Sequence, residues 1–271
     1  MKLNHLISNT VYLKFDSLSK TFSREGKALP VFDRVSIEVR PKELVALVGP
    51  SGCGKTTLLH IISGLVGRDS GEIFFNGVSV NHLQNQVAYM QQKDCLLLWR
   101  SALGHTLLNS EIAGENWAQA RNAARHLFEE FDLAGSENVY PGELSGGMRQ
   151  RVSLIRTLLC KKSVFLLDEP FGALDALTRR PLQEWFLQAW ARFNFSALFV
   201  THDVEEALIL ADRVYVLSAR PARVKTEIRI DLPHPRLPTD SKFVPLKAEL
   251  LAWLNQAHSI HADQGGTAHV S

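Results

Sequence analysis

Two glycine-rich segments of this chain each stand directly before an apolar run with helical character. The first is GPSGCGKT, residues 49–56, and the second is LSGGMRQR, residues 144–151, which leads into VSLIRTLL. The first N–H groups of a helix have no partner within the helix and lie at the positive end of its dipole, so such a start favours an anion. The sequence therefore predicts two anion-binding sites in one chain.

Residues 49–56 match the eight-residue phosphate-loop pattern, which follows a predicted strand at 44–48 and opens a predicted helix at 56–66. The glycines allow backbone N–H groups to turn toward phosphates, Lys55 would neutralise the β and γ oxygens, and the Thr56 hydroxyl would reach Mg²⁺. The alternative is a glycine-rich turn without a ligand, which the strand and helix on either side disfavour. We interpret Cys53 as a small filler rather than a reactive thiol. The predicted nucleotide-binding residues here are Gly49, Pro50, Ser51, Gly52, Cys53, Gly54, Lys55, Thr56 and Thr57.

Two acids follow the apolar run VFLL, residues 164–167. A buried parallel strand delivers the side chains at its carboxyl end into the ligand crevice. Asp168 suits support of a Mg²⁺ shell, and Glu169 suits a base that orients and deprotonates an attacking water. Such a pair can also be a helix N-cap with a first-turn acid. The phosphate loop favours the catalytic interpretation.

A histidine occupies the corresponding place after a third apolar strand. SALFV, residues 196–200, is followed by His202 and then by a predicted helix at 204–211. A single histidine at such a turn is commonly a cap or a surface residue. Its position at the mouth of the same predicted sheet favours a catalytic role.

Composition bounds the function. The chain has 271 residues, of which 45% are hydrophobic, enough for one large domain or two modest ones. Its formal charge of +2 argues against the broad basic field of a nucleic-acid-binding protein. The three cysteines lack the spacing of a metal site or a disulfide framework, which favours a reducing, cytoplasmic setting.

Membrane attachment through the chain itself is not expected. No apolar run approaches the roughly 18 to 20 residues that a bilayer span requires, and the first ten residues, MKLNHLISNT, lack the apolar core of a secretory signal. Any connection to a membrane is therefore expected to pass through a partner.

The predicted elements define an α/β fold. Short strands dominate the first ninety residues, and later strands alternate with helices, which implies a parallel sheet covered on both faces. A helical insert is predicted between 100 and 135, with one apolar face formed by Trp117, Ala120, Ala124, Leu127 and Phe128. The tail from residue 233 holds a short amphipathic piece, and its end, residues 256–271, is predicted to be disordered.

LSGGMRQR, GPSGCGKTT, FLLDEP, GALD and THD together resemble the ATP-binding subunit of ABC transporters, over roughly residues 12–230. The resemblance implies a P-loop NTPase with a mostly parallel sheet core, an N-terminal antiparallel β subdomain and a helical subdomain inserted at about 96–146. It sets the ATPase domain at 1–232 and leaves 233–271 as a C-terminal extension.

The resemblance also explains the second anion site. In this family two domains pair head to tail, and the signature of one caps the γ-phosphate of the ATP held by the other. Here Ser145, Gly146 and Gly147 would complete the partner's site, and Asp175 would bridge the two protomers. The implied cofactors are ATP and Mg²⁺.

Further roles follow from the same resemblance. Gln92 would touch Mg²⁺ and the attacking water, with the adjoining Gln91 as the competing choice, and His202 would contact the γ-phosphate. Phe22 would stack on adenine, although a core phenylalanine is the alternative. The implied Mg²⁺ ligands are Thr56, Gln92 and Asp168.

LLLWR at 96–100 and LSARPARVKTEIRIDLPHPR at 217–236 resemble the branch that serves nitrate, sulfonate, taurine and thiamine-pyrimidine importers. Leu98 stands where that branch has proline and His105 where it has asparagine, which leaves the substrate open. Leu96 to Trp99 is either buried packing or a permease-docking surface. We interpret the basic residues of the second segment as a solvated strand face. They are Arg220, Arg223, Lys225, Arg229 and Arg236.

The sequence thus predicts a peripheral ATPase on the cytoplasmic side of the cell membrane. Its partners would be a second copy of the chain, transmembrane permease subunits and a periplasmic or surface substrate-binding protein, without nucleic acid. The main alternative is a soluble ABC ATPase acting on DNA or ribosomes, which usually has two ATPase domains or a long coiled-coil insert. A regulatory module and a P-loop kinase are weaker alternatives. Cargo and transport direction do not follow from this chain, because the permease touches the cargo.

Overall fold

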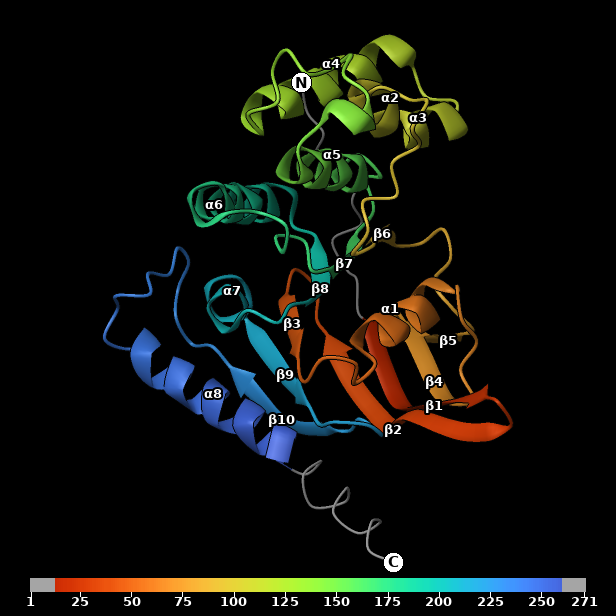
Figure 1. Cartoon of the computed structure of the whole chain (residues 1–271), viewed down its shortest axis with the longest axis vertical. Coiled ribbons are helices and arrows are strands. Elements are labelled where there is room, and N and C mark those ends of the chain that lie inside the picture. The colour runs from red at the N-terminus through yellow and green to blue at the C-terminus, as the bar shows by residue number, and fades with distance from the viewer. Residues whose placement is uncertain (1–12, 260–271) are drawn as a thin grey trace, which may run out of the picture. The chain divides into compact units, whose positions relative to one another are not determined.

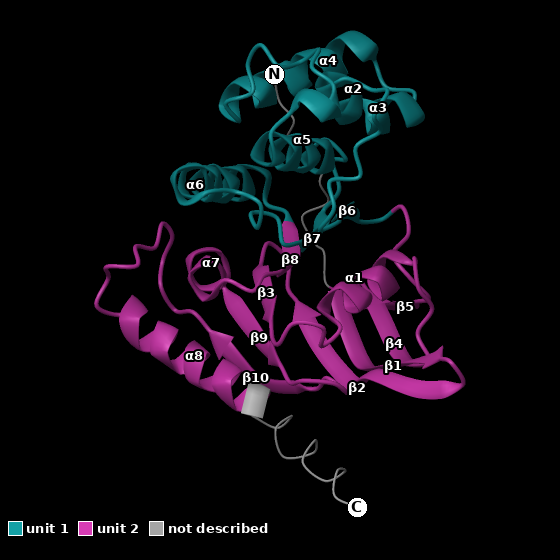
Figure 2. Cartoon of the chain, viewed as in Figure 1, with its two compact units in different colours: residues 1–7, 86–195 teal, residues 8–85, 196–271 magenta. Residues whose placement is uncertain are grey.

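A computed structural model describes residues 13–259, which divide into two compact units (Figure 2). Unit 1 contains residues 86–195, and unit 2 contains the described residues before 86 and after 195. Figure 1 labels the elements. The predicted disordered end lies outside the described residues from 260 on. Between 256 and 259 that prediction is wrong, because helix α8 continues through Ser259.

The elements of unit 2 run from the N-terminal strands to the C-terminal helix. They are β1 (Leu13–Arg24), β2 (Lys27–Val39), β3 (Leu44–Val48), α1 (Lys55–Ser63), β4 (Ser70–Phe75), β5 (Val78–Val80), β8 (Ser196–Val200), α7 (Val204–Leu210), β9 (Arg213–Leu217), β10 (Val224–Arg229) and α8 (Phe243–Ser259).

An antiparallel sheet with the order β2-β1-β4-β5 occupies the N-terminal part of unit 2 (Figure 1). The hairpin between β1 and β2 turns at Glu25 and Gly26, both with positive φ (53° and 77°), as a two-residue turn of the primed type requires. The predicted N-terminal antiparallel subdomain is confirmed.

The core of unit 2 is parallel. Strand β3 lies between β8 and β9 and is parallel to both, and β10 pairs antiparallel with β9. All residues of these three parallel strands are buried, which explains their continuous apolar runs. Helix α1 ends at Ser63 because Gly64 adopts a left-handed C-cap, so Leu65 of the predicted helix is instead an exposed residue after it.

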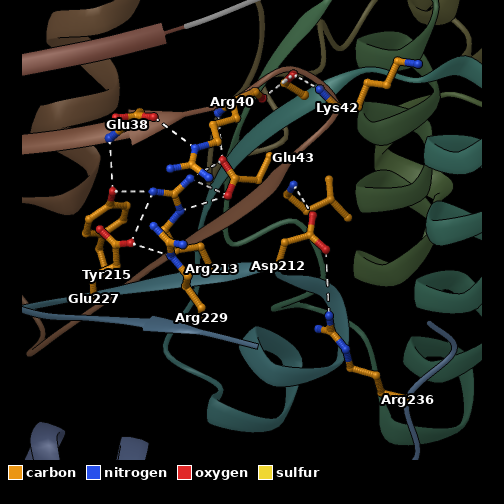
Figure 3. Close-up of polar contacts among 12 residues, drawn as sticks. Glu38, Arg40, Lys42, Glu43, Asp212, Arg213, Tyr215, Glu227, Arg229 and Arg236 are labelled. Atoms are coloured by element: carbon orange, nitrogen blue, oxygen red, sulfur yellow. Dashed lines mark hydrogen bonds and ion pairs between the residues drawn. The ribbon is translucent and has the colours of Figure 1, made fainter. Parts of the chain in front are cut away.

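An ionic network joins the starting ends of β3 and β9 to the finishing end of β10, which runs antiparallel to β9 (Figure 3). The Arg213 guanidinium, 2% exposed, donates to Glu43 Oε1 at 2.6 Å and Oε2 at 2.7 Å and forms an ion pair with Glu227 at 3.3 Å. Asp212 accepts the N–H of Leu44 at 2.9 Å. These contacts fix the register of the strands at this edge.

Arg236 corrects the prediction of a uniformly solvated basic face. It lies in the segment after β10, is only 6% exposed, and donates to the carbonyl groups of Leu208, Leu232 and Ala211. It also pairs with Asp212 at 3.8 Å (Figure 3). Arg236 therefore attaches the C-terminal extension to the end of α7.

Unit 1 combines a short parallel sheet with helices. Its elements are β6 (Ala88–Met90), α2 (Ala102–Thr106), α3 (Leu108–Ile112), α4 (Trp117–Glu130), the 3₁₀ turn η2 (Pro141–Glu143), α5 (Gly146–Leu158), β7 (Val164–Asp168) and α6 (Ala176–Phe193). Strands β6 and β7 are parallel, and α2 packs against α4 and α5.

Two local predictions for unit 1 need correction. On α4, Ala120, Ala124 and Phe128 are buried as predicted, but Trp117 at the helix start is 50% exposed. The apolar pattern predicts a helix at 180–192, but α6 begins already at Ala176, because the Asp175 side chain caps its start.

Candidate active site

The phosphate loop joins the end of β3 to the start of α1 in unit 2. Gly54 has φ +119°, and a Cβ there would lie 2.4 Å from Val31 Cγ1. A Cβ on Gly49 would lie 2.9 Å from the carbonyl oxygen of Leu217. Only glycine fits these two positions, so the loop closes tightly against its neighbours and its backbone is left to face a ligand.

Lys55 is the buried cation of this loop. Its side chain leaves the residue 8% exposed, and Nζ donates to the carbonyl oxygens of Gly49 at 2.8 Å and Pro50 at 3.0 Å. Carbonyl groups do not cancel a positive charge, so the ammonium stays available to an anion. Thr56 is in the first turn of α1, where its N–H has no partner within the helix. Cys53, the predicted filler, is 1% exposed.

Phe22 lies on β1 of unit 2 and is 37% exposed, so the alternative of a core phenylalanine is wrong. The Lys20 ammonium lies 5.2 Å from the centre of its ring. An exposed aromatic ring with a cation against it is suited to stacking on a base, although stacking itself stays a prediction.

His202 is exposed in the turn between β8 and α7, also in unit 2. The turn is fixed by its neighbours: Thr201 is buried, and its hydroxyl accepts the N–H of Asp203 at 3.0 Å. Asp203 in turn caps α7. Because β8 is parallel to β3, His202 and the phosphate loop follow the same ends of neighbouring strands.

Asp168 and Glu169 end β7 in unit 1. Asp168 is 1% exposed, and burial, followed by the Asp168 charge, raises the pKa of Tyr89 on the neighbouring strand β6. Glu169 has φ +52°, an uncommon left-handed conformation for a residue other than glycine. The backbone therefore turns sharply where the second acid leaves the strand.

Gln92 contacts Glu169 directly. Its amide Nε2 donates to Glu169 Oε2 at 3.1 Å, within unit 1. Gln91 instead lies within hydrogen-bond distance of the Cys95 thiol, 3.4 Å from its Oε1 to Sγ. The geometry favours Gln92 over Gln91 as the glutamine that shares a site with the predicted base.

Gln150 is a site residue that sequence reasoning missed. It lies on α5, is 7% exposed, and donates from Nε2 to the Glu169 carbonyl at 2.9 Å while accepting the Ala173 N–H at 2.8 Å. Both bonds hold the loop after β7. The segment LSGGMRQR gives no local signal for this role, because the burial of Gln150 and its two backbone partners depend on the tertiary fold.

The signature segment begins α5. Ser145 is the N-cap, and its hydroxyl accepts the Met148 N–H at 3.2 Å, while Gly146 and Gly147 form the first turn. Arg149 of the same turn donates to the Leu144 carbonyl at 2.8 Å and to Asp94 Oδ2 at 2.9 Å. This ion pair links the signature to the loop that carries Gln92.

Asp175 is the N-cap of α6. Its Oδ1 accepts the N–H groups of Leu177 and Thr178, each at 3.0 Å, and the Thr178 N–H is the main cause that lowers the pKa of Asp175. Leu177 beside it is 87% exposed. Bridging of protomers by Asp175 stays a prediction.

The segment from Leu96 to Trp99 divides between the two interpretations. Leu98 and Trp99 are 73% and 74% exposed, whereas Leu96 and Leu97 are half-buried. His105 is buried, and its Nε2 lies 3.0 Å from the Leu97 carbonyl oxygen. Its burial also lowers the pKa of His105, so the neutral ring donates this bond. His105 thus holds the backbone at Leu97, directly before the exposed apolar pair Leu98 and Trp99.

The residues fit a nucleotide and its metal. Gly49 and Gly54 of the phosphate loop leave no room for side chains, and Lys55 supplies a cation. The predicted donors Thr56, Gln92 and Asp168 offer oxygen atoms, which Mg²⁺ prefers when phosphates complete its shell. Among residues 13–259 no group of three His, Cys, Asp or Glu side chains could hold a metal alone. The predicted set is divided: Phe22, the phosphate loop and His202 belong to unit 2, and the other residues to unit 1 (Figure 2).

A family model described as ABC transporter matches residues 32–172. A taurine import ATP-binding protein of Chromobacterium violaceum is 40% identical over 237 residues, which cover 84% of this chain and 90% of that protein. A formylaminopyrimidine import ATP-binding protein of Halalkalibacterium halodurans is 38% identical, with 80% and 84% covered. An aliphatic sulfonates import ATP-binding protein of Bacillus cereus is 36% identical, with 88% and 94% covered.

Solved structures show the same fold. The dimeric structure of a bacterial ABC transporter cassette superposes with a TM-score of 0.74 at 23% identity, covering 82% of this chain and all of that one. The predicted fold class is confirmed. The chain belongs to the ABC transporter family, as an ATP-binding and ATP-hydrolysing subunit. None of its helices within residues 13–259 has both the length and the apolar character of a bilayer span.

Proposed function

We propose that this chain is the ATPase subunit of an importer for a small anionic or heterocyclic solute. The proteins named above for taurine, aliphatic sulfonates and formylaminopyrimidine support this choice, because they match most of the chain. The chain would act at the cytoplasmic side of the cell membrane, beside permease subunits and a substrate-binding protein. The particular solute is set by those partners.

One observation carries the proposal: the Gln92 amide holds the carboxylate of Glu169 at 3.1 Å. In the proposed mechanism, the phosphate loop and Lys55 bind the ATP phosphates, and Glu169 accepts a proton from the attacking water. Gln92 orients that water, and His202 contacts the γ-phosphate. Thr56, Gln92 and Asp168 would hold Mg²⁺, which neutralises charge on the phosphate oxygens when bound.

Two copies would share each nucleotide. Ser145, Gly146 and Gly147 present an exposed helix start with free N–H groups, which suits a γ-phosphate supplied by the partner subunit. ATP would then favour the closed dimer because it contacts both copies, and loss of the γ-phosphate would remove those contacts. This cycle would drive the permease through the exposed pair Leu98 and Trp99.

Glu169→Gln tests the catalytic assignment. The amide keeps the shape of the side chain but cannot accept the proton, so we expect turnover to fall about 10²- to 10⁴-fold while ATP binding persists. ATP hydrolysis by the full chain and its dimerisation by ultracentrifugation are the measurements. Glu249→Gln on α8, an exposed acid distant in sequence, is the matched control and should hydrolyse normally. Undiminished hydrolysis in Glu169→Gln would refute the base assignment.

A further inference from the structure

Arg220 lies in the turn between β9 and β10, beside the phosphate loop. Strands β3 and β9 pair Val48 with Val216, so Leu217 at the end of β9 adjoins Gly49 at the start of the loop. A Cβ on Gly49 would lie 2.9 Å from the Leu217 carbonyl oxygen and 3.3 Å from Cys53 Sγ. The turn that carries Arg220 begins at the very next residue.

The same turn also reaches the other end of the phosphate loop. Ala222 donates its N–H to the Val31 carbonyl at 2.8 Å and accepts the Asp33 N–H at 3.0 Å. Val31 is the residue that a Cβ on Gly54 would strike. The turn therefore lies near both ends of the phosphate loop, next to Gly49 through Leu217 and next to Gly54 through Val31.

Internal hydrogen bonds fix the shape of the turn. The Ser218 hydroxyl donates to the Ala219 carbonyl at 2.9 Å and accepts the Arg223 N–H at 3.0 Å. Ser218 N–H also donates to the Arg223 carbonyl at 2.9 Å. Arg220, at the tip, is consequently presented from a backbone that is already ordered, which lowers the entropy cost of a contact with a ligand.

The two arginines of the turn differ in their partners. Arg223 forms an ion pair with Asp33. Arg220 is exposed and, within residues 13–259, has neither an ion pair nor a hydrogen bond from its guanidinium. Its charge nevertheless reaches the loop: burial raises the pKa of the Cys53 thiol, and the charges of Lys55 and then Arg220 oppose that rise.

We propose that Arg220 is a second cation for the phosphates of the nucleotide held by this loop, beside Lys55. A guanidinium matches phosphate oxygens with two parallel N–H donors and remains charged at every physiological pH. No acid of the described chain competes for it. This inference rests on the proposed use of the phosphate loop and adds a binding residue to it.

Four variants of the full chain separate the contributions. Arg220→Gln removes the charge, Arg220→Lys keeps it, and Lys225→Gln removes an exposed charge a few residues away on β10. Lys55→Ala serves as the positive control. We would measure affinities for ADP, adenosine, and ATP in EDTA by calorimetry, at two salt concentrations and at protein concentrations below and above dimerisation.

We expect Arg220→Gln to lower the affinity for ADP and ATP about three- to tenfold, because it removes one nearby charge that is partly screened by solvent. Adenosine affinity should not change, Arg220→Lys should recover part of the loss, and Lys225→Gln should bind as the unmodified chain does. The loss should shrink at high salt. Thermal unfolding of Arg220→Gln should match that of the unmodified chain, since the exposed Arg220 guanidinium has no ion pair or hydrogen bond within residues 13–259.

Three results would overturn the proposal. One is unchanged ADP affinity in Arg220→Gln, and another is an equal loss for adenosine, which has no phosphate. The third is a loss confined to concentrations at which the chain dimerises, because this would assign Arg220 to the partner subunit. Normal ADP affinity in Lys55→Ala would refute the phosphate loop itself, and with it the proposed function.

Discussion

Positively charged side chains at the two ends of strands β3 and β9 in unit 2 have opposite environments. At the starting ends, Arg213 is buried and bound by Glu43 and Glu227. At the finishing ends, Lys55 contacts only carbonyl oxygens and a distant thiol, and Arg220 has no acid partner among the described residues. The first arrangement stabilises the fold, whereas the second leaves charge available for a ligand.

Desolvation explains the difference. A buried guanidinium loses its hydration, and this cost is recovered only when acids and acceptors surround it, as the two Glu43 oxygens surround Arg213. A cation meant for phosphate cannot be paired in this way, because a resident carboxylate would compete with the incoming anion. Pairing with acids thus distinguishes structural from ligand-binding cations at the two edges of one sheet.

Arg213→Leu should break the structural edge and produce the largest change in stability. Removal of Arg213 leaves the half-buried Glu43, whose side chain is 13% exposed, without its main counter-charge, which costs about 3 kcal/mol of the unfolding free energy. Urea denaturation of the full chain measures it. Nucleotide affinity of the folded variant should be unchanged, because Arg213 lies at the opposite end of β9 from the phosphate loop.

The double variant Arg213→Leu with Glu43→Leu is the control. It removes both buried charges, so it should be clearly more stable than Arg213→Leu alone. If both variants lose the same stability, the network contributes packing rather than charge compensation. The proposed contrast between the two edges would then be wrong.

The sequence predicted the ligand-binding edge better than the structural edge. The phosphate loop, Asp168, Glu169 and His202 each follow an apolar strand, so local pattern alone placed them at strand ends. Arg213 and Glu43 are 170 residues apart, and a charged residue at the start of a strand gives no local sign of its partner. Their pairing needs the tertiary fold.

Other residues were missed for the same reason. Gln150 is polar within a helix and was quoted with the signature, yet its two bonds go to backbone groups about twenty residues away. Arg236 follows a basic strand and resembles its neighbours, but tertiary contacts bury it against the end of α7. Amphipathic spacing on α4 predicted an apolar face of five residues, of which three are buried, Leu127 is half-buried and Trp117 at the helix start is 50% exposed.

A pH titration of stability tests the same contrast, and we expect an effect of intermediate size. His234 lies beside Arg236, and burial and then the Arg236 charge lower the pKa of His234 to about 4. The unfolded chain, with a pKa near 6.5, binds the proton more readily, so stability is complete above about pH 6.5 and declines toward pH 4. A pKa change from 6.5 to about 4 corresponds to about 3.4 kcal/mol. Solvent screening at this half-buried side chain reduces the expected contribution to roughly 2 to 3 kcal/mol of the unfolding free energy.

His234→Gln isolates this contribution, because glutamine keeps an amide N–H for the Leu210 carbonyl but does not titrate. The unfolding free energy of the unmodified chain and of the variant, measured at several pH values, should diverge only between pH 6.5 and about 4. Parallel profiles would show that His234 has the same pKa in the folded and the unfolded chain. The His234 ring would then become protonated in the folded chain below about pH 6.5, and the fold would tolerate this second cation beside Arg236 without an acid partner.

The smallest expected effect concerns Arg149 in unit 1, a cation that shares features of both classes. It pairs with Asp94 at 2.9 Å but remains about one-third exposed, so the pair should contribute about 1 kcal/mol or less. A double-mutant cycle of Asp94→Asn and Arg149→Gln measures this coupling by denaturation, and ATP hydrolysis measures its effect on the site. Because Asp94 follows Gln92 and Arg149 follows the signature, a coupling larger in hydrolysis than in stability would make this pair a positioning contact. Equal couplings would make it structural, like Arg213.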